Sequence, residues 1–251
     1  MKKRFDKLLN IVYTIRVVRL KPKGKEVRKM VRIDKRKTYM LVVDTETCNG
    51  LDEPLVYDLG FSIVDKAGNR YAHESFIIGE IFFGERELMN SAYYADKIPM
   101  YLEDIANGTR RVVHFDYAKE RMFALMKEYN AEIVCAYNAR FDVLALNFTQ
   151  QWLTEKKYFF PYGQSVWCIM KMATDTICKQ KMYDVFCKAN GYLTNHKTPQ
   201  NRRTAEVVYR YITNNTDFIE SHTALEDVEI ETEIMAHCFR QHKAMRKNLW
   251  G

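Results

Sequence analysis

The stretch Met40–Glu46, MLVVDTE, decides the fold, because a short continuous apolar run here ends in two acids. Such a run is typical of a strand that is buried on both faces. A strand alternates its side chains, so Asp44 and Glu46 point to the same side. A carboxylate placed there loses hydration, which is costly unless something compensates it. An isolated Asp-x-Glu favours a strand end that turns into solvent, and the same pattern recurs at Asp227 and Glu229.

The segments after this strand predict an α/β fold. LVYDLGFSIVD (55–65) and RYAHESFII (70–78) predict an antiparallel hairpin with its turn at 66–69, and AEIVCAYN (131–138) predicts another buried strand. Apolar residues at helical spacing predict helices at 117–129, 141–150, 169–188, 204–212 and 223–242. Strands followed by strand–helix alternation indicate a mixed β-sheet flanked by α-helices. The stretches 79–109 and 151–166 are expected to be irregular and substrate-facing, or to hold short helices.

Charge divides the chain into two parts. The net charge is +7, but residues 1–37 contain 15 Lys/Arg against 3 Asp/Glu, which leaves 24 Lys/Arg and 29 Asp/Glu for the rest. We therefore expect a basic N-terminal extension or linker at 1–37 and a folded domain at 38–245. A basic extension on a mildly acidic domain is typical of a protein that is attracted to nucleic acid. A solvated tail explains the same charges equally well.

Composition excludes several classes of protein. At 251 residues and 47% hydrophobic content, the chain can hold one sizeable domain with an appendage. No apolar run approaches the roughly 20 residues that span a bilayer, so we expect no membrane partner. Six cysteines without a Cys-x-x-Cys pair argue against a zinc ribbon or a disulfide framework. Reduced thiols fit a cytoplasmic protein, either in a bacterium or, for a phage protein, in its host.

A second acid follows the strand predicted at 131–138. Phe141 is expected to anchor the turn in the core, and Asp142 then lies in the first turn of the next helix. The helix dipole favours an ionised carboxylate there by a few tenths to about 1 kcal/mol. An ordinary N-terminal helix acid is the alternative interpretation. Asn138 could cap this helix or bind substrate, and capping is the simpler expectation.

A histidine and an acid stand together near the C-terminus in the segment HTALED, from His222 to Asp227. Thr223 or Ser221 can cap the following helix, which places Asp227 about one turn inside it. His222 then stays in the preceding loop, where it can reach a water molecule. On its own, an exposed loop histidine carries no functional meaning.

Together these groups predict a metal site. Functional groups in α/β sheets gather at the carboxyl ends of strands and on the helices that follow. Four carboxylates in one cleft repel each other, and two divalent ions roughly 4 Å apart relieve that repulsion and create a centre that cleaves phosphodiesters. Ligands that are all oxygen select Mg²⁺ or Mn²⁺. The expected metal ligands are Asp44, Glu46, Asp142 and Asp227.

The three segments resemble the three exonuclease motifs of the DnaQ-like (DEDD) superfamily. The resemblance covers about residues 39–243 and includes Leu59 and Gly60 in the second strand. A histidine five residues before the last aspartate resembles the DEDDh branch, and the position at which the DEDDy branch has tyrosine is Thr223 here. Two features depart from the family pattern: the common glycine after the first motif is displaced to Gly50, and the stretch 151–203 is long and tyrosine-rich.

The resemblance implies an RNase H-like fold and a 3′→5′ exonuclease that uses two Mg²⁺ or Mn²⁺ ions. His222 would be the general base among the catalytic residues, and nucleoside 5′-monophosphates would be the products. Substrate contacts are expected from Thr45, Thr47, Cys48, Asn138 and Phe141.

The substrate class stays open. Single-stranded 3′ ends of DNA are favoured over RNA, with a polymerase or other replication protein as a possible partner in a phage or bacterial setting. An exoribonuclease or oligoribonucleotidase of the same fold is the first alternative, because sugar selection depends on loops. A non-catalytic nucleic-acid-binding module is the second. Tyr93 and Tyr94 could stack on unpaired bases, although ordinary packing is the simpler expectation.

Overall fold

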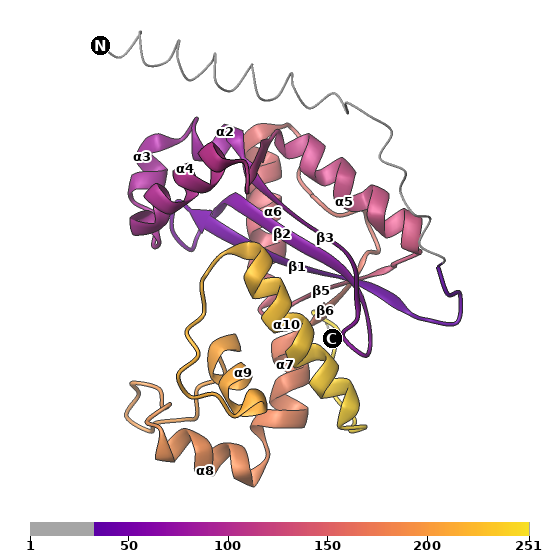
Figure 1. Cartoon of the computed structure of the whole chain (residues 1–251), viewed down its shortest axis with the longest axis vertical. Helices are drawn as coiled ribbons and strands as arrows, with labels where there is room; N and C mark the ends of the chain where they lie inside the picture. The colour runs from indigo at the N-terminus through magenta and orange to yellow at the C-terminus, as the bar shows by residue number, and fades with distance from the viewer. Residues whose placement is uncertain (1–32, 251) are drawn as a thin grey trace. The chain divides into compact units, whose positions relative to one another are not determined.

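A six-stranded mixed sheet, ordered β4-β3-β2-β1-β5-β6, forms the centre of the fold (Figure 1). The computed structural model describes residues 33–250, so residues 1–32 of the predicted basic extension lie outside the described residues. β1 pairs antiparallel with β2 and parallel with β5. The strands are β1 (Tyr39–Cys48), β2 (Leu55–Asp65), β3 (Arg70–Ile78), β4 (Arg111–Val113), β5 (Ile133–Ala136) and β6 (Ser165–Cys168).

Helices cover both faces of this sheet. On one face, α7 and α10 share a buried apolar cluster with Met40 and Val42 of β1. On the other face, Thr149 of α6 accepts a hydrogen bond from the backbone of β2, at 2.8 Å. The helices are α2 (Gly79–Phe82), α3 (Arg86–Asn90), α4 (Ile98–Asn107), α5 (Phe115–Tyr129), α6 (Ala139–Leu153), α7 (Ile169–Ala173), α8 (Lys181–Ala189), α9 (Ala205–Thr213) and α10 (Ala224–Arg240), with short turns η1 (Ala95–Lys97) and η2 (Thr174–Cys178).

The sequence therefore predicted the architecture well. The predicted mixed sheet flanked by helices is confirmed, and β2 and β3 have the predicted bounds. The long stretch between β3 and β4 contains four short helical segments, as one of the two expectations allowed. The short parallel strands β4 and β6 were not predicted, because three or four residues carry too little periodicity to be recognised. No helix within residues 33–250 is long and apolar enough to cross a membrane.

β1 does not end at its first acid. The strand continues through Asp44 and Glu46 to Cys48, with an irregularity in its pairing after Glu46. Side-chain alternation places both acids on the same face as Met40 and Val42, which is the face that α10 covers. The expectation of a strand end that turns into solvent is therefore wrong, because β2 and α10 continue to cover the strand past Asp44.

Gly60 on β2 allows α10 to lie close to the sheet. A Cβ atom at this position would come within 2.4 Å of the backbone carbonyl of Ala224, the first residue of α10. Gly60 is also the register partner of Asp44 on β1. The missing side chain thus lets the first turn of α10, which carries Asp227, approach the acids of β1.

The predicted helix 169–188 is interrupted. It divides into α7, the π-helical turn η2 and α8, and the chain is extended at Gln180. The side-chain amide of Gln180 donates to the carbonyl of Thr176 at 2.8 Å, which satisfies one of the carbonyls that the interruption leaves free. Tyr183 is buried beyond the break and donates to the carbonyl of Arg202 at 2.6 Å. The apolar spacing of the sequence does not reveal this break, because both segments have the same period.

Candidate active site

Four predicted acids meet beside the middle of the sheet. Asp44 and Glu46 come from β1, and Asp142 and Asp227 come from the first turns of α6 and α10. The pKa of Asp44 is raised well above its ordinary value, first by burial and then by the negative charges of its neighbours. Those neighbours are Glu231, Asp142, Asp227 and Glu46. Acids that are far apart in the sequence therefore share one electrostatic environment.

Burial is the main reason why these carboxyl groups retain protons. It raises the pKa of Glu46 to about 9, that of Asp142 to about 7 and that of Asp227 to about 8. Glu46 and Asp227 also repel each other, and the positive charge of Lys97 only partly offsets this effect. One carboxylate oxygen of Glu46 and one of Asp227 lie within 4.8 Å of each other. At neutral pH the site therefore binds either protons or cations.

Glu231 is a fifth acid of this cluster, and the sequence analysis missed it. It lies one helical turn after Asp227 on α10, and only 3% of its surface is exposed. Burial and the nearby charges of Asp142 and Asp227 raise its pKa well above the ordinary value. The spacing of four residues from Asp227 was a usable signal, since such a pair lies on one helix face. An acid on a face that is otherwise apolar is uncommon unless it has a partner.

The oxygen atoms of the cluster are incompletely hydrogen-bonded. Within residues 33–250, three buried side-chain oxygens have no hydrogen-bond partner: Asp227 Oδ1, Glu231 Oε2 and Ser62 Oγ. Separately, Glu46, His222 and Asp227 each offer one ligand atom, and these atoms all lie within 4.8 Å of one another. Oxygen-rich donors with unsatisfied atoms fit a hard divalent cation such as Mg²⁺ or Mn²⁺.

Asp142 is held by a neighbour on β1. The Thr45 hydroxyl donates to Asp142 Oδ1 at 3.0 Å, and this bond lowers the pKa of Asp142 against the larger effect of burial. Thr45 and Cys48 are buried, whereas Thr47 is partly exposed. Of these three predicted substrate-contacting side chains, only Thr47 is thus open to solvent.

The two predicted helix caps differ from the structure. Asn138 occupies the N-cap position of α6, but its side chain makes no capping hydrogen bond and is exposed. Phe141 is only partly buried, so it anchors the turn less completely than expected. Thr223 is the N-cap residue of α10, but its hydroxyl donates to the carboxylate of Glu226 at 2.5 Å instead of accepting from the backbone. Thr223 thus bonds to a nearby carboxylate, and the side chain of Asn138 is exposed to solvent.

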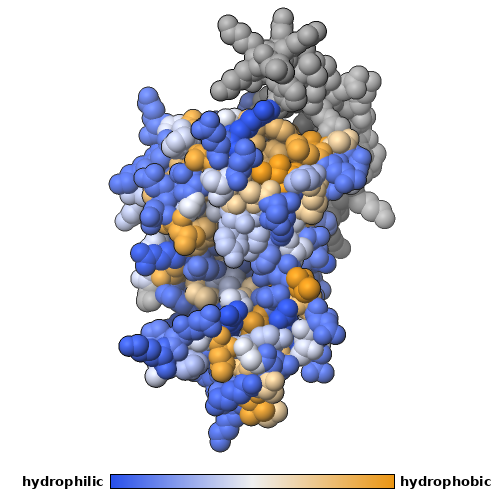
Figure 2. Space-filling model, turned by 90° about the vertical axis from the view of Figure 1, so that its left-hand side faces the viewer, coloured by the Kyte–Doolittle hydropathy of each residue, from blue (hydrophilic) through white to orange (hydrophobic). Residues whose placement is uncertain are grey.

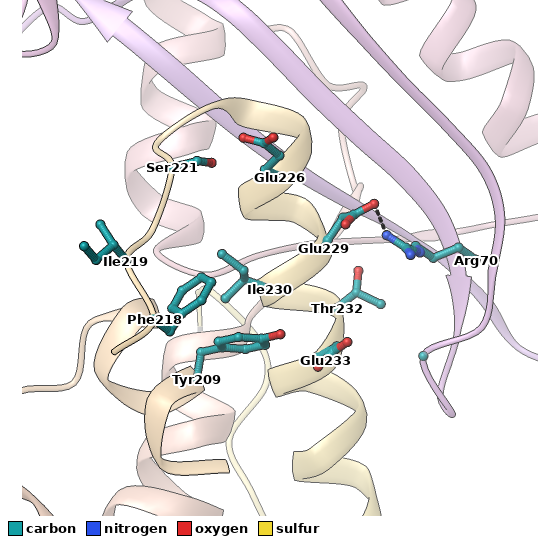
Figure 3. Close-up of a pocket in the computed structure, with 11 residues that line it drawn as sticks. Arg70, Tyr209, Phe218, Ile219, Ser221, Glu226, Glu229, Ile230, Thr232 and Glu233 are labelled. Carbon is teal, nitrogen blue, oxygen red and sulfur yellow. Dashed lines mark ion pairs between the residues drawn. The ribbon is translucent and has the colours of Figure 1, made fainter. Parts of the chain in front are cut away.

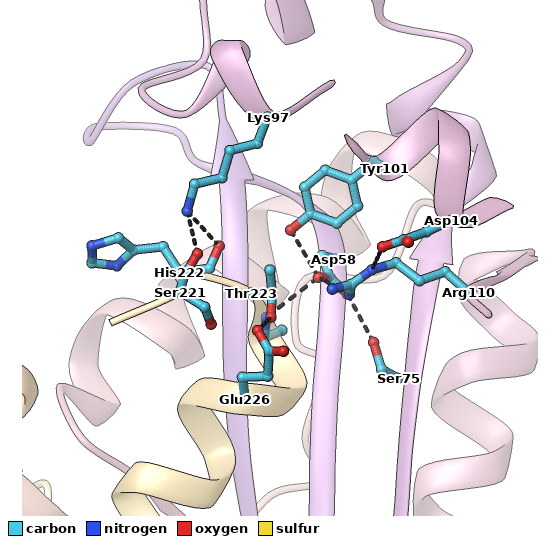
Figure 4. A network of polar contacts seen from close by, with 11 residues as sticks. Asp58, Ser75, Lys97, Tyr101, Asp104, Arg110, Ser221, His222, Thr223 and Glu226 are labelled. Carbon is cyan, nitrogen blue, oxygen red and sulfur yellow. Dashed lines mark hydrogen bonds and ion pairs between the residues drawn. The ribbon is translucent and has the colours of Figure 1, made fainter. Parts of the chain in front are cut away.

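Asp58 of β2 caps α10 across space (Figure 4). Its Oδ2 accepts from the backbone amide of Ala224 at 3.3 Å and from the hydroxyl of Tyr101 at 3.0 Å. Arg110 forms an ion pair with the same oxygen at 3.1 Å, and Ser75 donates to Oδ1 at 3.0 Å. Burial still raises the pKa of Asp58, although Arg110 and these hydrogen bonds oppose the shift. This carboxyl group fixes the start of the helix that carries Asp227.

His222 lies in the loop before α10, as predicted, and its backbone has φ of +50°. Its ring stacks on that of Tyr94, with centroids 4.6 Å apart and planes inclined by 19°. Its Nδ1 is 3.7 Å from Glu220 Oε2, which is longer than a hydrogen bond. Burial and the positive charge of Lys97 lower the pKa of His222, so its imidazole is neutral at neutral pH. A neutral imidazole can accept a proton.

A separate cavity of about 380 Å³ lies against another face of α10 (Figure 3). Its wall combines Tyr209 and Phe218 with Glu229 and Glu233, and Arg70 forms an ion pair with Glu229. None of the five clustered acids lines it, so this cavity is distinct from the candidate site. The molecular face shown in Figure 2 is largely hydrophilic, with small separate apolar patches.

No protein-family model matches the chain, and no curated protein sequence matches it. Several solved structures are similar to it. Exonuclease X in complex with 5′ overhanging duplex DNA is 17% identical over 80% of this chain and 91% of its own, with a TM-score of 0.36. Cell-death related nuclease 4 (CRN-4) is 9% identical over 84% and 67%, with a TM-score of 0.48. The zinc-bound E. coli ExoI–ssDNA complex is 14% identical over 82% and 42%, with a TM-score of 0.46. Such distant likenesses assign no role to a residue, so the roles proposed below rest on the geometry of this chain.

Proposed function

We propose that the chain is a divalent-metal-dependent 3′→5′ exonuclease of the DEDDh type. It would release nucleoside 5′-monophosphates from the ends of single-stranded DNA. One observation carries the proposal: Asp44, Glu46, Asp142 and Asp227 share one electrostatic environment, and the imidazole of His222 lies beside Glu46 and Asp227. A module that only binds nucleic acid gains nothing from buried acids that repel both each other and phosphate.

The chain's own residues divide the chemistry between them. Asp44, Glu46, Asp142 and Asp227 would hold two Mg²⁺ or Mn²⁺ ions. These ions, when bound, would supply positive charge to the scissile phosphate and acidify the attacking water. Thr45 orients Asp142 through its hydrogen bond. Asp58 keeps the first turn of α10, and with it Asp227, in place.

His222 would act as the general base. Its neutral imidazole would accept the proton from the attacking water as the water oxygen bonds to the phosphorus of the terminal phosphodiester. The bond from that phosphorus to the 3′-oxygen of the preceding nucleotide would break, and the shortened strand would leave with that oxygen. The lowered pKa of His222 supports this role, because the ring does not already carry that proton at neutral pH. Thr47 and the backbone of residues 45–48 would contact the terminal nucleotide, together with the exposed Asn138 and the partly exposed Phe141.

A product ladder tests the proposal directly. The full chain is incubated with 3′-labelled and 5′-labelled single-stranded DNA and RNA, in Mg²⁺, Mn²⁺ or a chelator. We expect the 5′-labelled DNA to shorten stepwise and the 3′ label to appear at once as a mononucleotide, only with metal. Asp142→Asn and His222→Ala should each abolish the ladder while DNA binding persists. Unchanged cleavage in both variants would refute the proposal, and faster cleavage of RNA would reassign the substrate.

A further inference from the structure

The segment between β3 and β4 reaches over to the loop that carries His222. Tyr94, just before η1, stacks its ring nearly parallel to the imidazole of His222, with centroids 4.6 Å apart. Tyr94 is partly buried, whereas its neighbour Tyr93 is 88% exposed. The face of Tyr94 that meets His222 is therefore covered by protein, which argues against this face as a platform for an unpaired base.

Lys97 contacts both the backbone of the loop at His222 and the ring of Tyr94. Its Nζ donates to the carbonyl oxygens of Ser221 and His222, the latter at 3.3 Å (Figure 4). The same ammonium group lies 4.5 Å from the centroid of the Tyr94 ring, within the range of a cation–π contact. One side chain thus fixes the loop at His222 and the ring on which the imidazole stacks.

The loop needs such support because its own conformation is unfavourable. His222 has a positive φ, which residues with a side chain rarely adopt. The N-cap side chain of α10, Thr223, bonds to Glu226 and not to the loop backbone. The nearest carboxylate oxygen to His222 Nδ1, on Glu220, lies beyond hydrogen-bond distance. The Tyr94 ring lies nearly parallel to the imidazole and therefore restricts its plane.

We propose that Tyr94 and Lys97 are positioning residues that hold the His222 imidazole in the orientation needed for proton transfer beside Glu46 and Asp227. This inference rests on the proposed exonuclease function. It gives the segment 79–109 a role in the chemistry, in place of the role in substrate contact that its length alone indicates. Neither residue would exchange a proton itself, so loss of either should slow the chemical step without weakening the binding of DNA.

Steady-state kinetics of the full chain with Mg²⁺ and single-stranded DNA, together with NMR of the His222 ring, test the inference. Tyr94→Leu removes the stack, and Tyr94→Phe keeps it. We expect kcat to fall about five- to tenfold in Tyr94→Leu, with KM within about twofold, and to stay near wild type in Tyr94→Phe. The ring protons of His222 should lose their upfield ring-current shift only in Tyr94→Leu. Tyr162→Leu, at a fully exposed tyrosine, is the matched control and should change neither quantity.

Lys97 provides the second arm of the test. Lys97→Met removes the ammonium group, whereas Lys97→Arg retains a donor that can reach the loop carbonyls. We expect kcat to fall in Lys97→Met and to recover in Lys97→Arg, again with KM little changed. Undiminished kcat in Tyr94→Leu, or a change confined to KM, would overturn the inference while the proposed function stands. Absence of metal-dependent cleavage by the wild-type chain would instead overturn the proposed function, and this inference with it.

Discussion

Glu46 and Asp58 face each other across β1 and β2, yet their carboxyl groups have opposite surroundings. Asp58 has an arginine, two hydroxyl groups and a backbone amide as partners on its two oxygens. Glu46 faces Asp227 in a cluster of acids with incomplete hydrogen bonding. Both groups are buried, so burial alone does not mark a functional acid. A functional acid is marked by the lack of compensating partners, because a buried charge without partners needs a ligand from outside the chain.

The largest effect on cleavage is expected at Asp227, a buried acid without compensating partners. Asp227→Asn should lower the rate of DNA cleavage with Mg²⁺ by about 10³-fold or more, because it removes a proposed metal ligand. It should also raise the melting temperature of the metal-free chain at pH 8, because it removes one of several repelling charges. Cleavage assays and thermal denaturation with a chelator measure the two changes. A variant that is both inactive and strongly destabilised would mean that the acid is structural, like Asp58.

Asp58 has compensating partners, so its replacement should destabilise the fold. Asp58→Ala leaves Arg110 without its buried partner and α10 without its cap, which should cost about 3 kcal/mol in the free energy of unfolding. Chemical denaturation of the wild type and the variant measures this loss. Glu53→Ala, at an exposed acid, is the control and should change little. A loss of under about 1 kcal/mol would remove the contrast between the two acids.

The stability of the metal-free chain should fall as pH rises. Glu46 and Asp227 have ordinary pKa values of 4.5 and 3.8, and burial raises them to about 9 and about 8 in the folded chain. The folded state therefore holds protons that the unfolded chain has already released, and this stabilisation is present at low pH and lost as pH rises through that window. We expect a loss of about 2 kcal/mol between about pH 5 and pH 8 in a chelator.

Divalent ions should weaken this dependence of stability on pH, because they replace the protons. Denaturation curves in Mg²⁺ should show a shallower slope of stability against pH than curves in a chelator, with the largest difference at the alkaline end. Asp227→Asn provides the comparison, since it should have a weaker pH dependence and a smaller response to Mg²⁺. A response to Mg²⁺ that is equal in the variant and the wild type would place the ions elsewhere.

The smallest expected effect is in the pH dependence of cleavage. Burial and Lys97 lower the pKa of His222 from its ordinary value of 6.5. If His222 is the base, kcat should fall on the acid side with a midpoint below pH 6.5, because the protonated ring cannot accept a further proton. A pH–rate profile measures this midpoint. A midpoint above 6.5 would contradict the assignment of His222 as the base in this environment.

The sequence predicted the parts of the site that depend on local pattern. Asp44 and Glu46 followed from strand alternation, and Asp142 and Asp227 followed from their places in the first turns of helices. Glu231 was missed, because its meaning depends on which face of α10 meets the sheet. Strand length at β1 was underestimated for the same reason, because the groups that surround an acid in the fold decide whether a strand tolerates it.

The contacts that hold the site together could not be predicted at all. The bond from Asp58 to α10 spans 166 residues, and the contact between Tyr94 and His222 joins two loops. Neither pair has a sequence spacing that a periodic pattern can reveal. Such contacts arise only when the sheet order and the close approach at Gly60 are fixed. The sequence thus predicted the acids that cluster here but not the contacts that support them.

Anomalous X-ray scattering from crystals of the full chain with Mn²⁺ at pH 8 tests the central claim most directly. We predict manganese bound among the carboxylates of Asp44, Glu46 and Asp227, and lost in Asp227→Asn crystals. Crystals in which these acids remain buried side by side while no manganese binds there would contradict the account. The acids would then be balanced by protons alone.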